Sequence, residues 1–308
     1  MAEKMATRQA YGEVLVELGE KNNNIIVLDA DLSKSTMTTH FAGQFPDRFF
    51  NMGISEQNLF GVAAGLALSG KTVFASTFAM FAAGRAFEII RNSIGYTKAN
   101  VKICATHAGL TVGEDGGSHQ TIEDIALMRT IPGLIVLSPS DGMSTRKLIE
   151  EAVLIDGPVY VRLGRYAVPG IYEKDSNIKI GKGICVVDGT DYTVIATGIM
   201  VNEAMIAAKT LADCGISLRV IDMHTIKPMD KDIIIKAAKE TKGIITAEEH
   251  SVIGGLGSAV AEIVVQNYAT KMAFIGMNDT FGESGKPPEL LQKYGLTADN
   301  IVKAVKGL

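Results

Sequence analysis

The feature that most constrains this chain is a regular alternation of short β-branched runs with longer segments of helical periodicity. Residues 25–28 and 101–105 are mostly apolar, which is typical of strands buried on both faces of a parallel sheet. Between such runs, for example at residues 56–68, apolar side chains recur at three- and four-residue spacing. The pattern predicts an α/β fold in which each sheet is mostly parallel and carries helices on both faces.

The chain divides into two such units. Its 308 residues exceed the usual size of a single domain, and a hydrophobic fraction of 47% is ample for two buried cores. Sustained periodicity disappears between residues 166 and 183, where proline, glycine and charged residues take over. We therefore expect a first domain at residues 1–165, a linker at 166–183 and a second domain at 184–308.

Strands and helices can be placed in both domains. In the first we expect strands at residues 25–28, 72–75, 101–105, 134–137 and 159–162, and helices at 8–18, 56–68, 78–94 and 141–154. In the second we expect strands at residues 192–196, 218–222, 243–247 and 273–275, and helices at 201–212, 230–240 and 256–265.

Charge and composition argue against several classes of function. Charged residues make up 21% of the chain, the net charge is -4, and no Lys/Arg-rich run favours binding to nucleic acid or to a membrane surface. No stretch approaches the roughly 20 apolar residues of a membrane-spanning helix, and the N-terminus lacks an apolar signal core. We expect a cytoplasmic protein whose partners are small molecules or other proteins.

The cysteines give no sign of a disulfide framework or a metal site. Cys104, Cys185 and Cys214 are scattered, odd in number and without metal-ligand spacing. We expect them to be reduced residues of the core, and we expect no metal site in this chain.

Two other features have a structural interpretation. His40, His224 and His250 have no comparable titratable neighbours, and we expect them to be structural. The GGLG segment at residues 254–257 opens a helix and could bind an anion there. A tight turn with close packing is the better interpretation.

Polar residues that could do chemistry are concentrated in three loops of the first domain. In an open parallel sheet, ligands bind at the carboxyl ends of the strands, in the loops that lead to helices. DADLSKST follows the first expected strand, THAGLTVGEDGGSHQ the third and LGRY the fifth. We therefore expect the functional site at these loops.

Glu56 opens the apolar helix expected at residues 56–68. The simpler interpretation is a first-turn glutamate favoured by the helix dipole, worth a few tenths to about 1 kcal/mol. The functional alternative is a carboxyl that burial keeps protonated, so that it can donate a hydrogen bond or exchange a proton.

The loop at residues 106–120 gathers His107, Glu114, Asp115 and His119 among glycines. Their long spacing does not match a compact zinc site. Because imidazole titrates near neutral pH, general acid–base work on a polyol is the more natural role. A polar surface loop is the alternative.

Aromatic and basic residues supply the remaining candidates. Phe78 and Phe81 begin the helix expected at residues 78–94, as core residues or as a stacking platform for a planar heterocycle. Arg8 opens the first helix, and Arg162 and Arg165 close the last strand of the first domain. A guanidinium fork suits phosphate, although each arginine taken singly could be a solvated surface residue.

These residues belong to a series of motifs that resembles the C-terminal half of the transketolase family along nearly the whole chain. The similar segments, in the same order, are ATRQ, DADLSKS, GISEQN, STFAMF, THAGLTVGEDGGSHQTIED, SPSDG and FGESGKPPELLQKYG. The GEDG–SHQ loop is the most specific of them. The resemblance implies a pyrimidine-binding first domain and a transketolase C-terminal second domain.

The resemblance also implies thiamine diphosphate as cofactor, held between this domain and a diphosphate-binding domain across a subunit interface. Glu56 matches the catalytic glutamate that hydrogen-bonds the aminopyrimidine ring and promotes removal of the thiazolium C2 proton. Phe78 and Phe81 match aromatics that pack around that ring. The chemistry is then the cofactor's, while protein groups orient it and handle protons.

Further positions match residues that bind the substrate. Asp115 and His119 match groups that contact sugar oxygens near the reacting carbon and are expected to take part in catalysis. The positions expected to bind the rest of the sugar phosphate are Arg8, Asp31, Ser35, His107 and Arg162. The alignment of Arg165 is left open by the local pattern YVRLGRY.

The chain departs from the family pattern in two places. GISEQN places Ser55 and Gln57 where transketolases commonly show GIREH, which affects the cofactor pocket. The Gly-Asp-Gly and Asn-Asn motif that holds the magnesium diphosphate is missing from the sequence. We therefore expect Mg²⁺ (or Ca²⁺) to be held mainly by a partner, an N-terminal transketolase subunit, in an α2β2 assembly.

The expected function is that of the C-terminal subunit of a two-chain transketolase, which transfers a two-carbon ketol unit from a ketose phosphate to an aldose phosphate. The alternatives within the superfamily are part of a deoxyxylulose-phosphate synthase or a decarboxylating dehydrogenase beta subunit. Asp115 and His119 with Ser35 and Arg8 favour ketose-phosphate recognition over both. A non-catalytic interaction subunit is the alternative of another class, and the presence of Glu56 argues against it.

Overall fold

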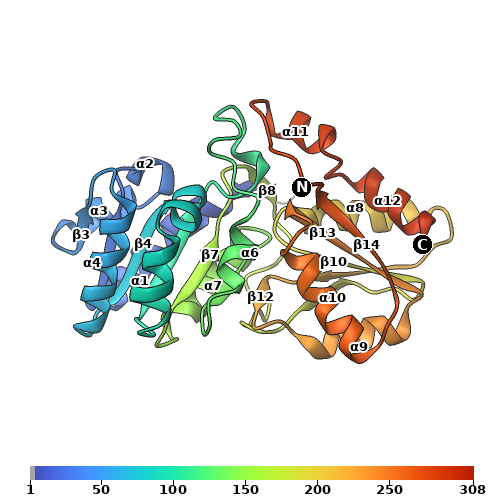
Figure 1. Ribbon diagram of the computed structural model, residues 1–308, viewed down its shortest axis with the longest axis horizontal. Helices are drawn as coiled ribbons and strands as arrows, with labels where there is room; N and C mark the ends of the chain where they lie inside the picture. The colour runs from blue at the N-terminus through green and yellow to red at the C-terminus, as the bar shows by residue number, and fades with distance from the viewer. Residues whose placement is uncertain (1–3) are drawn as a thin grey trace.

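The computed structural model describes residues 4–308, which fold into two α/β domains lying side by side (Figure 1). The first domain is coloured blue to green in Figure 1, and the second yellow to red. The predicted fold class is confirmed, because both sheets are mostly parallel and carry helices on both faces. Within residues 4–308, no helix combines the length and the apolar character needed to cross a membrane.

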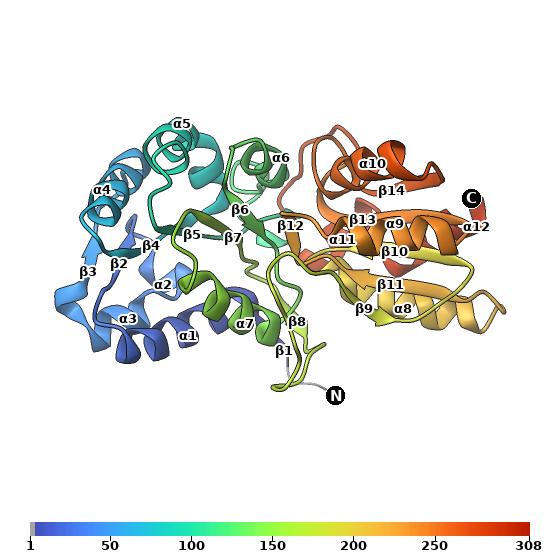
Figure 2. The same cartoon turned by 90° about the horizontal axis from the view of Figure 1, so that it is seen from below.

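The first domain is built on a seven-stranded sheet with the order β12-β6-β7-β5-β4-β2-β3. Helices α1 (Thr7–Lys21) and α7 (Gly142–Val153) cover one face, and α4 (Glu56–Leu68) and α6 (Asp124–Arg129) cover the other (Figure 2). The strands that this domain contributes are all parallel: β2 (Ile25–Asp29), β3 (Phe49–Asn51), β4 (Thr72–Phe78), β5 (Val101–Thr106), β6 (Ile135–Leu137) and β7 (Val159–Arg162).

The second domain has a five-stranded sheet with the order β14-β13-β10-β11-β9. Helices α8 (Met200–Ala212) and α12 (Ala298–Gly307) pack together on one face, and α9 (Lys231–Glu240) and α10 (Leu256–Asn267) on the other. Its strands are β9 (Ile184–Val187), which is antiparallel, and the parallel strands β10 (Tyr192–Ala196), β11 (Leu218–Asp222), β13 (Gly243–Ser251) and β14 (Lys271–Met277).

Shorter elements complete the chain. They are β1 (Lys4–Ala6), α2 (Ser33–Thr36), α3 (Thr39–Gln44), η1 (Pro46–Arg48), η4 (Leu110–Val112), β8 (Ala167–Pro169), β12 (Thr225–Lys227) and α11 (Pro287–Lys293).

One strand pairing crosses from the second domain to the first, and another ties the expected linker to the start of the chain. Strand β12 comes from the second domain but pairs antiparallel with β6, at the edge of the first domain's sheet. Strand β8 lies in the segment expected to be a linker and pairs with β1. The sequence pattern missed both because three-residue strands are too short to show a periodicity.

The helix expected at residues 78–94 begins later than predicted. Phe78 is the last residue of β4, where it is paired with Thr106 of β5. The helical segment that follows is irregular and consists of η2 (Phe81–Arg85), α5 (Phe87–Ile89) and η3 (Ile90–Gly95). Phe78 therefore projects from the carboxyl end of a strand, which is where ligands of parallel sheets bind.

The prediction that all three cysteines are core residues is wrong for two of them. Cys104 is buried in β5, but Cys185 and Cys214 are exposed, and all three are free thiols. Cys185 lies on β9, an edge strand of the second sheet, and Cys214 follows the end of α8. Neither position is covered by a second layer.

A buried carboxyl joins the domains at the end of β11. Asp222 Oδ2 accepts hydrogen bonds from Ser140 Oγ at 2.6 Å and from the Tyr172 hydroxyl at 2.8 Å. Its Oδ1 has no hydrogen-bond partner within residues 4–308. Burial raises the pKa of Asp222 to about 7, so the folded protein binds this proton far more tightly than the unfolded chain.

Replacing this carboxyl should change how stability depends on pH. Because the pKa of Asp222 is raised to about 7 on folding, its contribution to stability falls as the pH rises through that value. We expect the melting temperature of Asp222→Asn minus that of the wild type to increase as the pH rises from 5 to 8. Thermal unfolding of both proteins across this range measures the difference. The matched control is Asp188→Asn, at an exposed position, for which the difference in melting temperature from the wild type should not depend on pH. If the difference for Asp222→Asn also does not depend on pH, the assignment is contradicted.

Candidate active site

Candidate residues cluster at the carboxyl ends of β2, β4, β5 and β7, in the first domain. Asp31, after β2, has φ 63, and His107, after β5, has φ 57. Left-handed backbone is uncommon for residues other than glycine, and it concentrates at functional sites where the surroundings hold it in place. The strain thus marks two of the loops that the sequence singled out.

Arg8, Ser35 and His107 are brought together by the fold. Arg8 Nη1 donates to the Ser35 carbonyl oxygen at 2.6 Å and lies 3.5 Å from His107 Nε2. Because a guanidinium can only donate, Nε2 is the acceptor, so the ring proton is on Nδ1 and points to Thr106 Oγ1 at 2.9 Å. Ser35 contributes its carbonyl to this contact rather than its hydroxyl.

The imidazole of His107 is neutral. Burial lowers its pKa to about 3, and the nearby Arg8, Arg165 and His119 act in the same direction. The pKa of Arg8 is lowered by burial and by Arg165. His107 can therefore take part in hydrogen bonding to an anion, while the positive charge of the cluster comes from the arginines.

An aromatic platform lies beside this cluster. The rings of Phe78 and His107 are stacked with centroids 3.8 Å apart, and those of Phe78 and Phe81 with centroids 5.9 Å apart. His119 stands edge-on to Phe81 at 5.6 Å. Phe78 is buried and Phe81 is partly exposed, so the platform is a site feature rather than only core packing.

Glu56 is the first residue of α4 and is only 2% exposed. Burial of this carboxyl agrees with both interpretations of its role, and it has a partner, because Arg85 Nη1 lies 2.8 Å from Glu56 Oε2 in an ion pair. Arg85 also lies over the ring of Phe81 at 4.9 Å. The sequence analysis missed Arg85, although its four-residue spacing from Phe81 places both on one helical face.

Asp115 and Asp31 lie at the rim of the site. The carboxylate of Asp115 is about half exposed and lies 3.8 Å from Arg165 Nη1. Asp31 is exposed, and its Oδ1 accepts a hydrogen bond from Asn51 Nδ2 at 2.9 Å. Within residues 4–308, neither carboxylate makes a direct polar contact with Arg8, His107 or His119.

Arg162, which was expected among the phosphate ligands, has buried partners within the protein. Arg162 is buried, and its Nε lies 3.1 and 2.9 Å from the two carboxylate oxygens of Asp124. Its Nη2 donates to the Glu249 carbonyl at 2.8 Å. Arg162 is the last residue of β7, and its Nε and Nη2 already have buried partners. Arg165 lies beyond the strand end beside Asp115, is partly exposed, and its charge lowers the pKa of His107.

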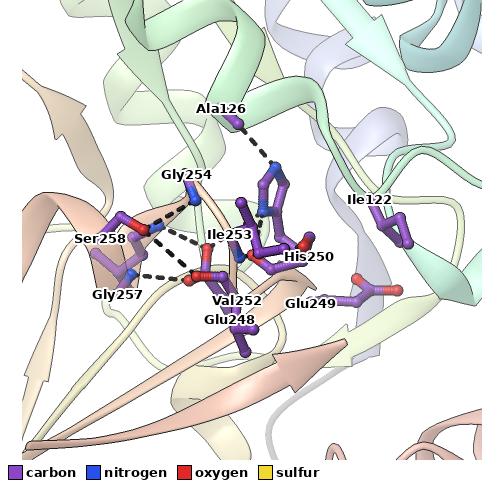
Figure 3. Close-up of polar contacts among 12 residues, drawn as sticks. Ile122, Ala126, Glu248, Glu249, His250, Val252, Ile253, Gly254, Gly257 and Ser258 are labelled. Carbon is purple, nitrogen blue, oxygen red and sulfur yellow. Dashed lines mark hydrogen bonds and ion pairs between the residues drawn. The ribbon is translucent and has the colours of Figure 1, made fainter. Parts of the chain in front are cut away.

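The GGLG segment forms a tight turn, as the sequence analysis favoured. Glu248 Oε2 accepts from the Leu256 amide at 2.6 Å and Oε1 from the Gly257 amide at 2.8 Å (Figure 3). The carboxylate thus occupies the helix N-terminus that an external anion would need. A Cβ on Gly257 would lie 2.3 Å from the Phe274 ring, so no side chain fits there.

His224 and His250 were expected to be structural, and no metal site was expected in the chain. Among residues 4–308, no group of three or more His, Cys, Asp and Glu side chains is placed to hold a metal ion. His250 is buried, accepts from the Ala126 amide through Nε2 at 3.3 Å, and donates from Nδ1 to the Ser251 carbonyl at 2.7 Å (Figure 3). His224 is buried next to Thr225, with a pKa lowered to about 4 by burial. Both are structural, as expected.

Comparison with known families gives a consistent result over both domains. A family model of the transketolase pyrimidine-binding domain matches residues 3–170, and a model of the transketolase C-terminal domain matches residues 181–301.

Individual proteins agree with the family models. A protein of Methanocaldococcus jannaschii, provisionally named as a transketolase C-terminal section, is 54% identical over 97% of this chain and 94% of its own length. Human transketolase is 39% identical over 100% of this chain but only 50% of its own length, so the chain spans about half of that relative. A solved structure described as a split-gene transketolase in an inactive β4 tetramer is 56% identical, with a TM-score of 0.92 and 98% coverage of both chains.

Because Arg162 is buried and Arg165 is partly exposed, replacing them should change the free energy of unfolding by different amounts. Arg162→Met leaves Asp124 as an unpaired buried charge, and we expect it to lower the free energy of unfolding by about 3–5 kcal/mol. Arg165→Met removes a partly exposed cation and should cost less than about 1 kcal/mol. Urea denaturation of the two variants measures both values. Similar losses in the two variants would show that Arg162 is not the buried structural cation described here.

Proposed function

This chain belongs to the transketolase family, and on that premise we propose that it is the C-terminal subunit of a two-chain transketolase. It would transfer a two-carbon ketol unit from a ketose phosphate to an aldose phosphate, together with a partner subunit. The observation that supports this most is the convergence of an aromatic pair, a buried glutamate and a basic cluster at one edge of the first sheet. These are the parts needed to hold a heterocycle, a proton and a sugar phosphate.

The first domain fits the aminopyrimidine half of thiamine diphosphate. Phe78 and Phe81 offer stacked faces for a planar ring. Among residues 4–308 only Arg85 hydrogen-bonds the Glu56 carboxylate, through Oε2, so Oε1 is available to bond a ring nitrogen. When bound, thiamine diphosphate would supply the nucleophilic carbon needed for transfer of the ketol unit. Glu56 exchanges a proton with the aminopyrimidine, and Arg85 holds the carboxylate in place for that exchange.

The diphosphate and its metal are assigned to the partner. The described part of the chain has no cluster of acidic residues or histidines suited to a divalent cation. We therefore propose that Mg²⁺ or Ca²⁺ and the diphosphate are held by an N-terminal subunit with a diphosphate-binding domain. The split-gene transketolase described as an inactive β4 tetramer is consistent with this division.

Arg8 and Arg165 are the cations proposed for the phosphate of the sugar. Arg8 is half-buried beside His107, and Arg165 influences both residues electrostatically. Neutral His107 can donate from Nε2 to a phosphate oxygen if its ring proton moves from Nδ1, in which case Thr106 Oγ1 becomes the donor to Nδ1. Ser35 and Asp31 close this side of the site, and Arg162 acts only as a structural residue.

His119 and Asp115 are proposed to contact the sugar near the reacting carbon. His119 lies edge-on to both phenylalanine rings, and therefore next to any heterocycle stacked on them. Its Nδ1 contacts Ser118 Oγ at 3.0 Å, which fixes the orientation of the ring. Proton transfer to a sugar oxygen is the role suited to such an imidazole. Asp115 is exposed and can move from Arg165 to a sugar hydroxyl.

The partner has a suitable surface next to Glu56. On the outer side of α4, Gly61 and Gly65 have no atom within 4 Å of the place where a Cβ would be. A second chain could approach this backbone closely and complete the cofactor site from that side. We propose an α2β2 assembly in the cytoplasm, acting in sugar-phosphate metabolism such as the pentose phosphate pathway.

The activity is tested by adding the partner chain, thiamine diphosphate and Mg²⁺, then xylulose 5-phosphate with ribose 5-phosphate. Sedoheptulose 7-phosphate should form without carbon dioxide. Carbon dioxide released from pyruvate with glyceraldehyde 3-phosphate, and no ketol transfer, would replace this proposal with the synthase alternative.

In the same assay, two variants separate binding from catalysis. Arg165→Met removes a phosphate contact made in both ground and transition states, so it should raise KM by about tenfold to a hundredfold. His119→Ala removes a proton-transfer group, and kcat should fall by roughly a hundredfold or more. Arg91→Met, at an exposed arginine outside the site, is the control. A KM unchanged in Arg165→Met would remove that residue from the phosphate site.

A further inference from the structure

The loop at residues 106–122 is embedded in the second domain. Leu110, near the start of the loop, and Ile122, its last residue, are buried in the same hydrophobic cluster as Val194 and Met277 of the second sheet. Figure 1 shows the loop, in green, beside the segment that leads into α11, in red. The loop's own regular structure consists of the three-residue turn η4 and an isolated bridge, in which the Gly109 amide donates to the Thr121 carbonyl at 2.9 Å. The bridge closes the base of the loop, and the part between its two ends packs against the second domain.

Glu249 makes the most buried polar contact between this loop and the second domain. It lies near the end of β13, is 5% exposed, and its Oε1 accepts from the Thr111 amide at 2.6 Å. The neighbouring Glu248 points to the other side, toward α10, as Figure 3 shows. A Cβ on Gly109 would lie 2.4 Å from the Glu249 carboxyl carbon, so the loop backbone closes directly over this carboxylate.

A buried cation accompanies this carboxylate. Arg162 Nη2 donates to the Glu249 carbonyl at 2.8 Å, and the same guanidinium is paired with Asp124. Burial raises the pKa of Glu249, while Arg162 and the Thr111 amide oppose that shift. The negative charge of the Glu249 carboxylate is thus partly balanced by the positive charge of Arg162, which belongs to the first domain.

The far end of the loop is held by the segment that precedes α11. Gln120 Nε2 donates to the Glu283 carbonyl at 2.9 Å, and Ser284 Oγ donates to the Glu114 carbonyl. A Cβ on Gly117 would lie 2.8 Å from the Gly282 carbonyl oxygen, so the two backbones are in close contact. The second domain thus grips the loop on both sides of Asp115.

We propose that the second domain positions the sugar-binding loop, and that Glu249 is its main positioning residue. His107 and His119 stand at the two ends of the gripped segment, and Asp115 lies between them. Fixing the Thr111 amide fixes the short turn between His107 and Asp115, and with it the spacing of the groups that meet the sugar. The inference rests on the proposed function for its link to sugar transfer, but the grip itself can be measured without activity.

Glu249→Gln is the direct test, measured by amide hydrogen exchange in the protein without partner or cofactor. The amide keeps the shape of the side chain but replaces a charge-assisted hydrogen bond with a weaker one. We expect peptides covering residues 106–122 to exchange faster, on the order of tenfold at the Thr111 amide. Glu248→Gln is the matched control, because Glu248 is the neighbouring residue of β13 and its carboxylate caps the start of α10. This change weakens that cap but leaves the contacts of the loop in place. Its faster exchange should be confined to the start of α10.

Ser284→Ala keeps the test valid if Glu249→Gln does not fold. Ser284 is exposed, so its loss should leave the fold intact and speed exchange around Glu114. If Glu249→Gln folds and amide exchange in its loop is unchanged, the inference is overturned. If Glu249→Gln does not fold, unchanged exchange in the loop of Ser284→Ala overturns it.

The second readout uses the complex with partner, thiamine diphosphate and Mg²⁺. Glu249→Gln should leave the apparent affinity for thiamine diphosphate unchanged, because Glu56, Phe78 and Phe81 lie on other elements. Its kcat/KM for the ketose phosphate should fall at least about tenfold, with Glu248→Gln near the wild type. A loosened loop with unchanged sugar kinetics overturns the positioning role. If the wild-type complex itself transfers no ketol unit, the proposed function fails instead, while the exchange result still decides the grip.

Discussion

The buried ion pair between Arg162 and Asp124 is the interaction on which the rest of the structure depends. It joins the end of β7 to the start of α6, and Tyr160 donates a further hydrogen bond to Asp124 at 2.8 Å. Through Nη2 the same arginine reaches the backbone of β13 in the second domain. One guanidinium therefore ties the two domains together under the loop that carries His107 and His119. A buried charge of this kind is strongly destabilising when its partner is lost.

This arrangement explains how a site in one domain comes to depend on the other. The parallel sheet of the first domain places its loops at one edge, and the longest of them has one short turn and one bridge of its own. Contacts from Glu249 and the segment before α11 hold the part between the ends of that bridge. On the proposal made above, the second domain would influence sugar transfer through the shape of this loop, although within residues 4–308 its side chains are not among the assigned site residues.

Much of this could be predicted from the sequence because the strongest signals are local. Apolar runs and helical periodicity identified the main strands, and polar residues at the ends of those strands predicted where the candidate site lies. Arg162 and Arg165 were harder, since three positions separate them and the pattern YVRLGRY does not say which guanidinium a distant carboxylate has already paired. Arg85 was missed because its partner, Glu56, is 29 positions away in the chain. Such long-range pairings become visible only in the folded structure.

In the proposed complex, this chain contributes Glu56 to a cofactor that a partner chain holds by its diphosphate. Hydrogen–deuterium exchange at the thiazolium C2 of thiamine diphosphate, followed by NMR, tests this most directly. We expect rapid exchange only when the partner and the wild-type chain are both present, and at least about a hundredfold slower exchange when Glu56→Gln replaces the wild type. Equally rapid exchange with Glu56→Gln, or with the partner alone, would contradict the account.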